Sequence, residues 1–410
     1  MKRIISLLLC LVLTCFVFTG CSESTLDDFK KDLDDLLNKD GLVLNSDRQE
    51  IVLDFYIIFE DGTTDSAMAT VERDINAYLP TIKLDKDSSE LKTTLDIHYL
   101  TESEYYSTVK NDSALTGDDR ADIVLIVGKD MFSDMMDNNM LAELTDYYST
   151  RKYGLLNTQI ADSLIQASKY SVKTVDTSGT LYDDLRLYTV PNNHVVGEYQ
   201  YLLINTAIAQ YYLFGEEKLA AMTTYESTLE LRERIESDNL DASQYVKVVS
   251  GTYTDKAKLE SEGYSVNIIS YPTATADEAF MSAFGIVRHE LDMRFGEEYE
   301  MDKNKADRIS KENRDAFEAH YDRCMEVIYA LNTDSTFRNL LQYGSRGTTY
   351  NYNAETNTAT RVTEGDGVYR INLLYTGDIF KAYFCEDFGW NKDSLANGEK
   401  QNVQSVAEGK

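Results

Sequence analysis

The sequence has few of the residues that build covalent or metal-based sites. Three of its five cysteines (Cys10, Cys15 and Cys21) lie near the start of the chain, which leaves only Cys324 and Cys385. Two cysteines so far apart make no disulfide framework, although a single bridge between them stays open. We expect both to be small, buried, apolar side chains. There is no CxxC motif and no Cys/His cluster, so neither a zinc site nor a cofactor is expected.

Motifs of nucleotide-binding proteins and hydrolases are also missing. The chain contains no GxGxxG, no Walker sequence and no GxSxG nucleophile elbow. His289-Glu290 lacks the second histidine of a zinc-protease helix. Glu60 and Asp61 have the residue types of a glycosidase acid/base pair, but neighbouring residues at a strand end point apart. We therefore predict that the protein is not an enzyme, with a cell-surface hydrolase as the least favoured alternative.

Basic residues are scarce relative to acidic ones. The chain has 40 Lys and Arg against 70 Asp and Glu, a formal net charge of −30. Such a charge makes nucleic acid and anionic lipid surfaces poor partners. It serves either solubility or the steering of a cationic ligand, and net charge alone does not choose between them.

The N-terminal segment has the pattern of a bacterial lipoprotein signal. Lys2 and Arg3 precede an apolar run, and the small residues Thr19-Gly20 precede Cys21. Cleavage there leaves Cys21 as the new N-terminus, carrying lipid on its sulfur. Phe18, where such signals usually have Leu, is a departure. The alternatives are a transmembrane anchor, for which the run is short of the roughly 20 residues needed, and an ordinary secretory signal with a chance Cys.

These features predict where in the cell the protein is located. We expect residues 1–20 to be a signal peptide and residues 21–46 to be a charged stalk with an amphipathic pattern. The folded part is then held by its lipid on the outer face of a cell membrane, of a Gram-positive type. No later apolar run approaches the length of a membrane span.

Strands and helices alternate at the start of the folded part. Apolar, β-prone runs occupy three segments, residues 50–59, 95–100 and 121–127. Each run is followed by a helix signal: a cap at Thr64 or Asp65 with a stop at Pro80, a capping box over residues 101–104, and a helix over residues 129–140. This alternation predicts an α/β lobe with a mainly parallel sheet, which binds ligands at the carboxyl ends of its strands.

Five later segments resemble, in order, passages of one protein family. They are LYTVPNNHVVGEYQYLLINTAIAQYY from Leu187, ISYPTATADEAFMSAFGI from Ile269, CMEVIYALNTDSTFRNLL from Cys324, LLQYGSRGTTYNYN from Leu340 and INLLYTGDIFKAYF from Ile371. The family is the extracellular solute-binding lipoproteins of ABC importers, close to the oligosaccharide-binding group (family 1 type). There are three departures: the stretch from residue 198 to 270 is short for a complete second lobe, residues 397–410 form an early polar tail, and Ser345-Arg346 replaces the usual Ile-Glu.

The resemblance implies a two-lobed α/β fold of the periplasmic-binding-protein type II, with extended crossing segments as a hinge and a ligand cleft between the lobes. We expect residues 47–190 and 272–342 in the first lobe, and residues 191–271 and 343–410 in a trimmed second lobe. Function then follows as an expectation: a monomeric receptor delivers a carbohydrate-like solute, or else a peptide or an amine, to ABC permease subunits by hinge closure. A surface sensor or interaction lipoprotein that has lost transport is the alternative.

Candidate ligand contacts follow from loop position and residue type. Strand-end and hinge loops supply carboxylates, a lysine and amides, while tyrosines and the single Trp offer flat stacking surfaces with a polar tip. The candidates are Phe59, Glu60, Asp61, Lys129, Asn192, Asn193, His194, Tyr271, Tyr343, Tyr350, Asp378 and Trp390. The opposing interpretation is structural: Asn-Asn after a proline makes a good turn, and each aromatic can equally pack in a core.

Overall fold

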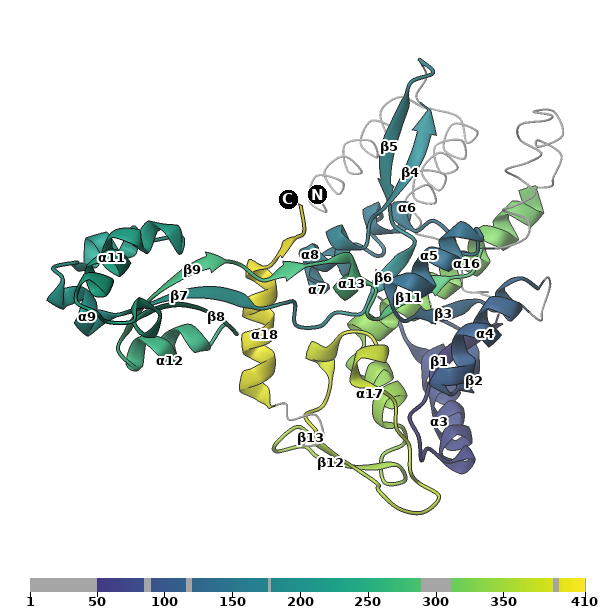
Figure 1. Ribbon diagram of the computed structural model, residues 1–410. Coiled ribbons are helices and arrows are strands. Elements are labelled where there is room, and N and C mark those ends of the chain that lie inside the picture. The colour runs from purple at the N-terminus through teal and green to yellow at the C-terminus, as the bar shows by residue number, and fades with distance from the viewer. Residues whose placement is uncertain are drawn as a thin grey trace, which may run out of the picture.

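The computed structural model describes residues 50–84, 90–115, 120–175, 178–288, 311–385 and 391–409, with side chains from residue 320 onward in the helix that begins at Lys311. The predicted signal peptide, the stalk, Cys21 and Trp390 lie outside the described residues. The described chain is mixed α/β, as predicted, and forms a larger and a smaller unit (Figure 1). Within it, no helix combines the length and the apolar character needed to cross a bilayer.

A five-stranded sheet forms the centre of the larger unit. Its order is β2 (Thr93–Leu100), β1 (Ile51–Ile58), β3 (Ile123–Ile126), β11 (Ala283–Ile286) and β6 (Thr189–Pro191). β1 pairs in parallel with β2 and β3, whereas β11 runs antiparallel to β3 and β6. All four residues of β3 are buried, and β1 is buried along most of its length. The three apolar runs therefore form the predicted strands, within two residues at each end.

Helices cover this sheet. They are α3 (Asp65–Tyr78), η1 (Leu79–Thr81), α4 (Glu102–Ser113), α5 (Lys129–Asp137), α6 (Thr145–Ser149), α7 (Leu156–Gln159), α8 (Asp162–Ala167), α13 (Ala276–Ala279), α16 (Lys311–Thr333) and α17 (Ser335–Tyr343). Thr64 caps α3 as predicted, since its side chain accepts from the Ala67 N–H. The capping box predicted for α4 is wrong in detail, because the Thr101 hydroxyl donates to Glu104 instead of accepting a backbone N–H.

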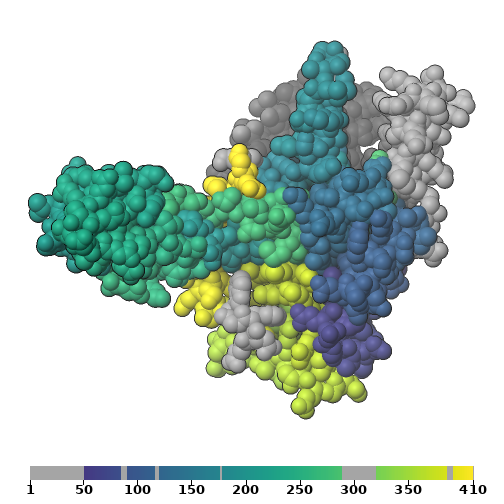
Figure 2. Space-filling view, in the orientation of Figure 1, coloured from purple at the N-terminus to yellow at the C-terminus, as the bar shows by residue number. Residues whose placement is uncertain are grey.

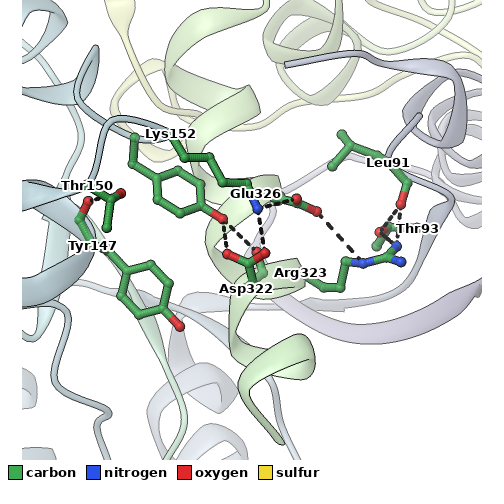
Figure 3. Close-up of polar contacts among 9 residues, drawn as sticks. Leu91, Thr93, Tyr147, Thr150, Lys152, Asp322, Arg323 and Glu326 are labelled. Carbon is green, nitrogen blue, oxygen red and sulfur yellow. Dashed lines mark hydrogen bonds and ion pairs between the residues drawn. The ribbon is translucent and has the colours of Figure 1, made fainter. Parts of the chain in front are cut away.

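A partly buried charge network holds α16 against the rest of the unit (Figure 3). Glu326 is only 1% exposed, and its carboxylate lies 2.7 Å from Lys152 Nζ, which also pairs with Asp322. On the other side of the helix, Arg323 donates to the Thr93 hydroxyl at the start of β2. A buried carboxylate is costly without such partners. The network fixes α16, and with it α17, which follows after a single residue.

The smaller unit is built from one continuous stretch, residues 199–270. Its elements are β7 (Tyr199–Asn205), α9 (Thr206–Tyr211), α10 (Glu216–Ala220), η3 (Glu226–Thr228), α11 (Leu229–Ser237), η4 (Ala242–Gln244), β8 (Val246–Gly251), α12 (Asp255–Ser261) and β9 (Tyr264–Ser270). β7 lies between β8 and β9, antiparallel to both. Leu202 and Ile204 pack with Leu231 and Ile235 in a core that shares no residue with the core of the larger unit. In Figure 2 this unit stands out from the rest of the molecule.

Two extended segments connect the units. The outgoing one runs from β6 to β7, and the returning one runs from β9 through β10 (Thr273–Ala274) and α13 to β11. Beside them lies α18 (Lys392–Gln404), followed by β14 (Val406–Ala407), which pairs in parallel with β10. This is the arrangement of crossing segments that the resemblance implied.

The stretch between α17 and α18 departs from the expected division of the chain. It contains β12 (Tyr350–Asn353), β13 (Thr358–Arg361), η5 (Leu373–Tyr375) and η6 (Ile379–Lys381). Residues 343–410 were expected in the second lobe, but Tyr369 and Ile371 pack into the core of the larger unit. The loop after β1 holds their neighbours, since the Glu60 N–H donates to Arg370 O and the Thr64 N–H donates to Val368 O. A separate hairpin, β4 (Tyr170–Val175) and β5 (Leu181–Arg186), projects from the larger unit (Figure 1).

Candidate functional site

One edge of the large sheet gathers the features that the sequence pointed to. β1, β2, β3 and β6 run in the same direction, so their carboxyl ends share one edge, the carboxyl edge below. β11 begins at this edge, because Ala283 pairs with both Ile126 and Pro191. Both crossing segments therefore meet the sheet here, through Asn192 and Ser282. The edge at which α/β sheets bind ligands is thus also the edge from which the smaller unit is reached.

Phe59, Glu60 and Asp61 leave β1 at the carboxyl edge. The Phe59 N–H donates to Leu100 O (3.1 Å), and the Glu60 N–H donates to Arg370 O (2.9 Å). Phe59 and Glu60 are half-buried, while Asp61 is exposed. The backbone fixes the first two against the sheet, and their side chains border its edge.

A segment from far along the chain, residues 366–376, runs beside the carboxyl edge. The Thr64 N–H donates to Val368 O (2.9 Å) at one end, and Asn192 Nδ2 donates to Leu374 O (2.9 Å) at the other. From α17, Gln342 Nε2 donates to Ile371 O (2.6 Å). The segment therefore spans the edge from the end of β1 to the end of β6, and the hydrogen bond from Gln342 attaches its middle to α17.

This segment brings a tyrosine to two carboxylates. Burial raises the pKa of Tyr375, and the nearby charges of Glu102 and Glu60 raise it further. Glu102 is exposed at the start of α4, after the end of β2. The candidates from the sequence missed both Glu102 and Tyr375. The strand-end rule that selects Glu60 also selects Glu102, whereas no local pattern marks Tyr375.

Lys129 lies on the same edge, after β3. It is the first residue of α5 and is exposed. Gly128 before it has φ +89°, a conformation that glycine adopts without strain, and its N–H donates to Phe280 O (2.7 Å). Lys129, Glu60 and Glu102 thus place charged groups of both signs along the ends of three neighbouring strands.

Four predicted site residues come together at the hinge itself, in a buried group that we call the hinge network. Asn193 Nδ2 donates to Asp378 Oδ1 (3.1 Å), and Asn192 Nδ2 donates to Ser282 Oγ (2.6 Å). His194 Nδ1 lies 2.9 Å from Asn192 O. Asn402 of α18 donates to His194 O (2.6 Å). The network comprises Asn192, Asn193, His194, Ser282, Asp378 and Asn402, all buried.

Burial sets the electrostatics of the hinge network. It lowers the pKa of His194, so the imidazole is neutral, and its Nδ1–H donates to the Asn192 carbonyl. Burial also raises the pKa of Asp378 to about 6, against the lowering effect of the Phe380 N–H that bonds it. The polar side chains of the hinge network form hydrogen bonds among the two crossing segments, the 371–385 stretch and α18. They position the hinge and face inward.

A cavity of about 320 Å³ lies beside the hinge network. Its walls come from η6 and the residues after it, from the start of α17 and from α18. They carry Phe380, Tyr383 and Phe384 as aromatic surface, with Lys381, Lys392 and Glu399 as charged groups. The cavity is large enough for a small polar molecule with aromatic rings against one side.

The predicted stacking aromatics are dispersed. Tyr343 and Tyr350 are buried in a small cluster with Tyr383, and the Tyr343 hydroxyl donates to Tyr383 O (2.7 Å). Tyr271 is 48% exposed at the start of the returning crossing segment, edge-on to Tyr199. Of the three tyrosines, Tyr271 alone presents a free ring face to solvent. Cys324 and Cys385 are both buried, as predicted, and no disulfide joins them.

Three potential metal ligands come together in the described residues, but not at this edge. Asp54, Asp96 and His98 offer ligand atoms within 4.8 Å of one another on β1 and β2. They lie in the middle of these strands.

Comparisons with known proteins give solved structures only. No family model matches the chain, and no curated protein matches it. The N-glycan transport solute-binding protein NgtS of Streptococcus pneumoniae is similar at 13% identity and a TM-score of 0.46, over 88% of this chain and 84% of that one. A family 1 extracellular solute-binding protein of Alicyclobacillus acidocaldarius is similar at 10% identity and a TM-score of 0.37, over 88% of each chain.

A third similar structure is the ABC substrate-binding protein Lmo0181 of Listeria monocytogenes, in complex with cycloalternan, at 10% identity and a TM-score of 0.27, over 71% of this chain and 78% of that one. All three are described as solute-binding proteins. At these identities and TM-scores, what this chain does and binds has to be argued from its own residues.

Proposed function

We propose that this protein is a solute receptor that closes its two α/β units around a carbohydrate-like solute without making or breaking a bond. The observation that carries the proposal is the pair of separate cores joined by crossing segments at the carboxyl edge. Two rigid bodies with few connections move by a hinge. A solute that touches both bodies only when they are close together favours the closed state by its extra contacts.

The solute contacts that we propose lie on the carboxyl edge. Glu60 and Glu102 offer carboxylate oxygens, which accept hydrogen bonds from sugar hydroxyls, and Tyr375 offers a hydroxyl beside them. Phe59 gives half-buried aromatic surface next to Glu60. Lys129 donates to a ring or hydroxyl oxygen. Phe59 supplies a flat apolar surface, the two glutamates supply acceptors and Lys129 supplies a donor. Recognition of a polar ring requires this combination.

The division into lobes is a proposal as well. We assign residues 50–190 and 272–385 to the first lobe and residues 199–270 to the second, with α18 bridging them. Gln401 of α18 donates to Gly197 O (2.6 Å) and accepts from the Tyr253 N–H (3.0 Å) of the second lobe. The exposed ring of Tyr271 lies where the return crossing leaves that lobe and is the aromatic surface we place on the second side of the solute.

We place the receptor on the outer face of the membrane, held by lipid on Cys21, with ABC permease subunits as its partner. The support is the sequence pattern before Cys21 and the charged stretch that follows it. Replacing Cys21→Ala should abolish incorporation of labelled palmitate and release the protein into the medium. If the variant stays in the membrane fraction, the segment acts as a transmembrane anchor.

A binding screen tests the receptor proposal. Thermal unfolding is followed with N-glycan fragments, cyclic and linear glucose oligosaccharides, peptides and polyamines, and each hit is measured by titration calorimetry. A solute at a hundred times its dissociation constant stabilises the folded state by about 2.7 kcal/mol, which is a clear rise in Tm. If only a peptide or a polyamine binds, that class replaces carbohydrate as the proposed solute. If nothing binds, the sensor or interaction alternative is favoured.

Variants locate the site once a solute is known. We expect Glu60→Gln and Tyr375→Ala to weaken binding tenfold or more and to leave the Tm of the free protein within a few degrees. Glu364→Gln, an exposed carboxylate on a nearby loop, is the control and should leave affinity unchanged. Unchanged affinity in both site variants would move the site away from the carboxyl edge, toward the cavity beside the hinge.

A further inference from the structure

Two neighbouring strands of the large sheet place metal-binding side chains side by side. β1 and β2 pair in parallel, with Asp54 opposite Asp96 and Tyr56 opposite His98. Residues opposite each other in a parallel pair project from the same face, and so do residues two apart on one strand. Asp54, Asp96 and His98 therefore converge on one patch of the sheet. Their ligand atoms all lie within 4.8 Å of one another.

The imidazole of His98 is held in place from two sides. Its Nε2 lies 2.7 Å from Asp54 Oδ1, and its ring stacks on the Tyr56 ring at 4.2 Å with 7° between the planes. The Tyr56 hydroxyl in turn donates to Asp112 of α4 (2.9 Å). Packing that fixes a ligand's orientation before the metal arrives is what distinguishes a metal site from a chance group of charges.

The carboxylates have a charge conflict that a cation removes. Asp54 and Asp96 are directly opposite, and like charges in that position are destabilising. Within the described residues, the Asp96 carboxylate makes no hydrogen bond and no ion pair, and it is exposed. Asp54 is positioned further by its own N–H, which donates to Asp122 Oδ2 (2.9 Å). A divalent cation between the two carboxylates converts the repulsion into two attractions.

We propose that Asp54, Asp96 and His98 form a binding site for a divalent transition metal such as Zn²⁺. Two carboxylate oxygens and one imidazole nitrogen suit Zn²⁺ or Mn²⁺, whereas Ca²⁺ takes six to eight oxygens. Tetrahedral zinc with bonds of about 2.0–2.2 Å places its ligand atoms about 3.3–3.6 Å apart. Side-chain rotations that separate His98 Nε2 from Asp54 Oδ1, now 2.7 Å apart, and draw in Asp96 reach this geometry. Exposure of Asp96 leaves the remaining coordination positions to solvent.

The site is distinct from the proposed solute cleft. At roughly 3.3 Å per residue, Asp54 lies about 13 Å before the carboxyl end of β1 at Ile58, and His98 lies about 7 Å before the carboxyl end of β2 at Leu100. Because the ligands come from two adjacent strands, the metal ties β1 to β2, the edge strand of the sheet. The consequence is local: the metal stabilises the first lobe and leaves solute binding to the cleft.

Calorimetric titration of the EDTA-treated protein with Zn²⁺ tests the site. We expect saturable binding of one ion per chain, with affinity lowered at least tenfold by Asp96→Asn and by His98→Gln. Asp96→Asn should not lower the Tm of the metal-free protein, because Asp96 has no partner to lose and its repulsion of Asp54 is removed. Glu233→Gln, an exposed carboxylate on α11, and His320→Gln, whose imidazole pairs with Asp122, should leave Zn²⁺ affinity unchanged.

The alternative is that Asp54 and His98 form an ion pair and nothing more. No saturable Zn²⁺ binding, or binding that survives both site variants, would overturn the proposal. Loss of binding in His320→Gln with full binding in His98→Gln would do so too. A second readout is Co²⁺ in place of Zn²⁺: its visible absorption band should appear in the parent protein and disappear in His98→Gln.

Discussion

Asp378 is a buried carboxylate whose protonation should be visible in the stability of the protein. Burial raises its pKa to about 6, from 3.8 in an exposed carboxyl. Between these values the folded state holds a proton that the unfolded state has lost, so this residue's contribution to stability falls as pH rises through the window. The loss between pH 5 and pH 7 is about 1 kcal/mol.

Asp378→Asn tests this at the residue scale. The Asn oxygen can still accept from Asn193 Nδ2 and from the Phe380 N–H, the two bonds that Asp378 Oδ1 accepts. We expect urea unfolding to show about 1 kcal/mol less loss of stability between pH 5 and pH 7 in the variant than in the parent. An equal pH dependence in the two proteins would mean that Asp378 is ionised throughout this range.

The same residues show how far the sequence determines a site. Asn192, Asn193, His194 and Asp378 were chosen by their positions, and the structure does bring them together, but facing inward. Asn192 bonds Leu374, 182 residues further along the chain, and His194 bonds Asn402, 208 residues further along, so no local pattern reveals their burial. Glu102 follows a predicted strand and was within reach of the strand-end rule. Tyr375 was not, because its place depends on tertiary packing.

Elements were the most predictable level. β3 is a continuous apolar run and β1 is interrupted only by Asp54, and a strand that is largely buried needs such a run whatever surrounds it. The end of α3 follows from Pro80, which cannot continue a helix. The sequence predicts residues 343–410 in the second lobe, whereas Tyr369 and Ile371 pack in the core of the larger unit, and the short strands and turns of this stretch carry no periodicity that identifies a packing partner. Hydrogen bonds from Gln342 to Ile371 O and from the Thr64 N–H to Val368 O attach this stretch to the larger unit.

Gly398 fits α18 against the outgoing crossing segment. A Cβ at this position would lie 2.5 Å from Val195 Cγ2 and 3.1 Å from a Phe380 ring carbon. Gly398→Ala gains up to about 1 kcal/mol in helix propensity, but overpacking costs about 1–3 kcal/mol. We expect a net loss of about 1 kcal/mol in urea unfolding. Gly215→Ala, with no atom within 4 Å of the new Cβ, should change stability by less than about 0.5 kcal/mol.

Gln401 is the single side chain of α18 that bonds both the crossing segment and the second lobe. It donates to Val196 O and Gly197 O and accepts from the Tyr253 N–H. Gln401→Leu leaves these backbone groups unpaired, at about 1–3 kcal/mol for each one that stays buried. We expect faster hydrogen exchange at the Tyr253 amide and a lower Tm, with no change in Glu399→Gln. Unchanged exchange at Tyr253 would show that Gln401 does not restrain the second lobe.

At the scale of the whole molecule, hinge motion requires that each unit hold its own structure. The smaller unit meets this requirement, because helices pack on both faces of its sheet. Leu202 packs toward α11, while Tyr201 and Leu203 pack on the opposite face with Val266. Its 72 residues are few for an independent core, so its stability depends on every large apolar side chain.

Leu231→Ala tests this independence. Leu231 is fully buried in the second-lobe core, and its truncation should cost about 2–5 kcal/mol there. If the lobes are separate units, hydrogen exchange should quicken in β7, β8 and β9 while β1 and β3 keep their protection. Leu125→Ala, in the fully buried β3, should give the reverse pattern. Equal loss of protection in both sheets would mean that the chain unfolds as one unit, and rigid-body closure of the second lobe would then lose its physical basis.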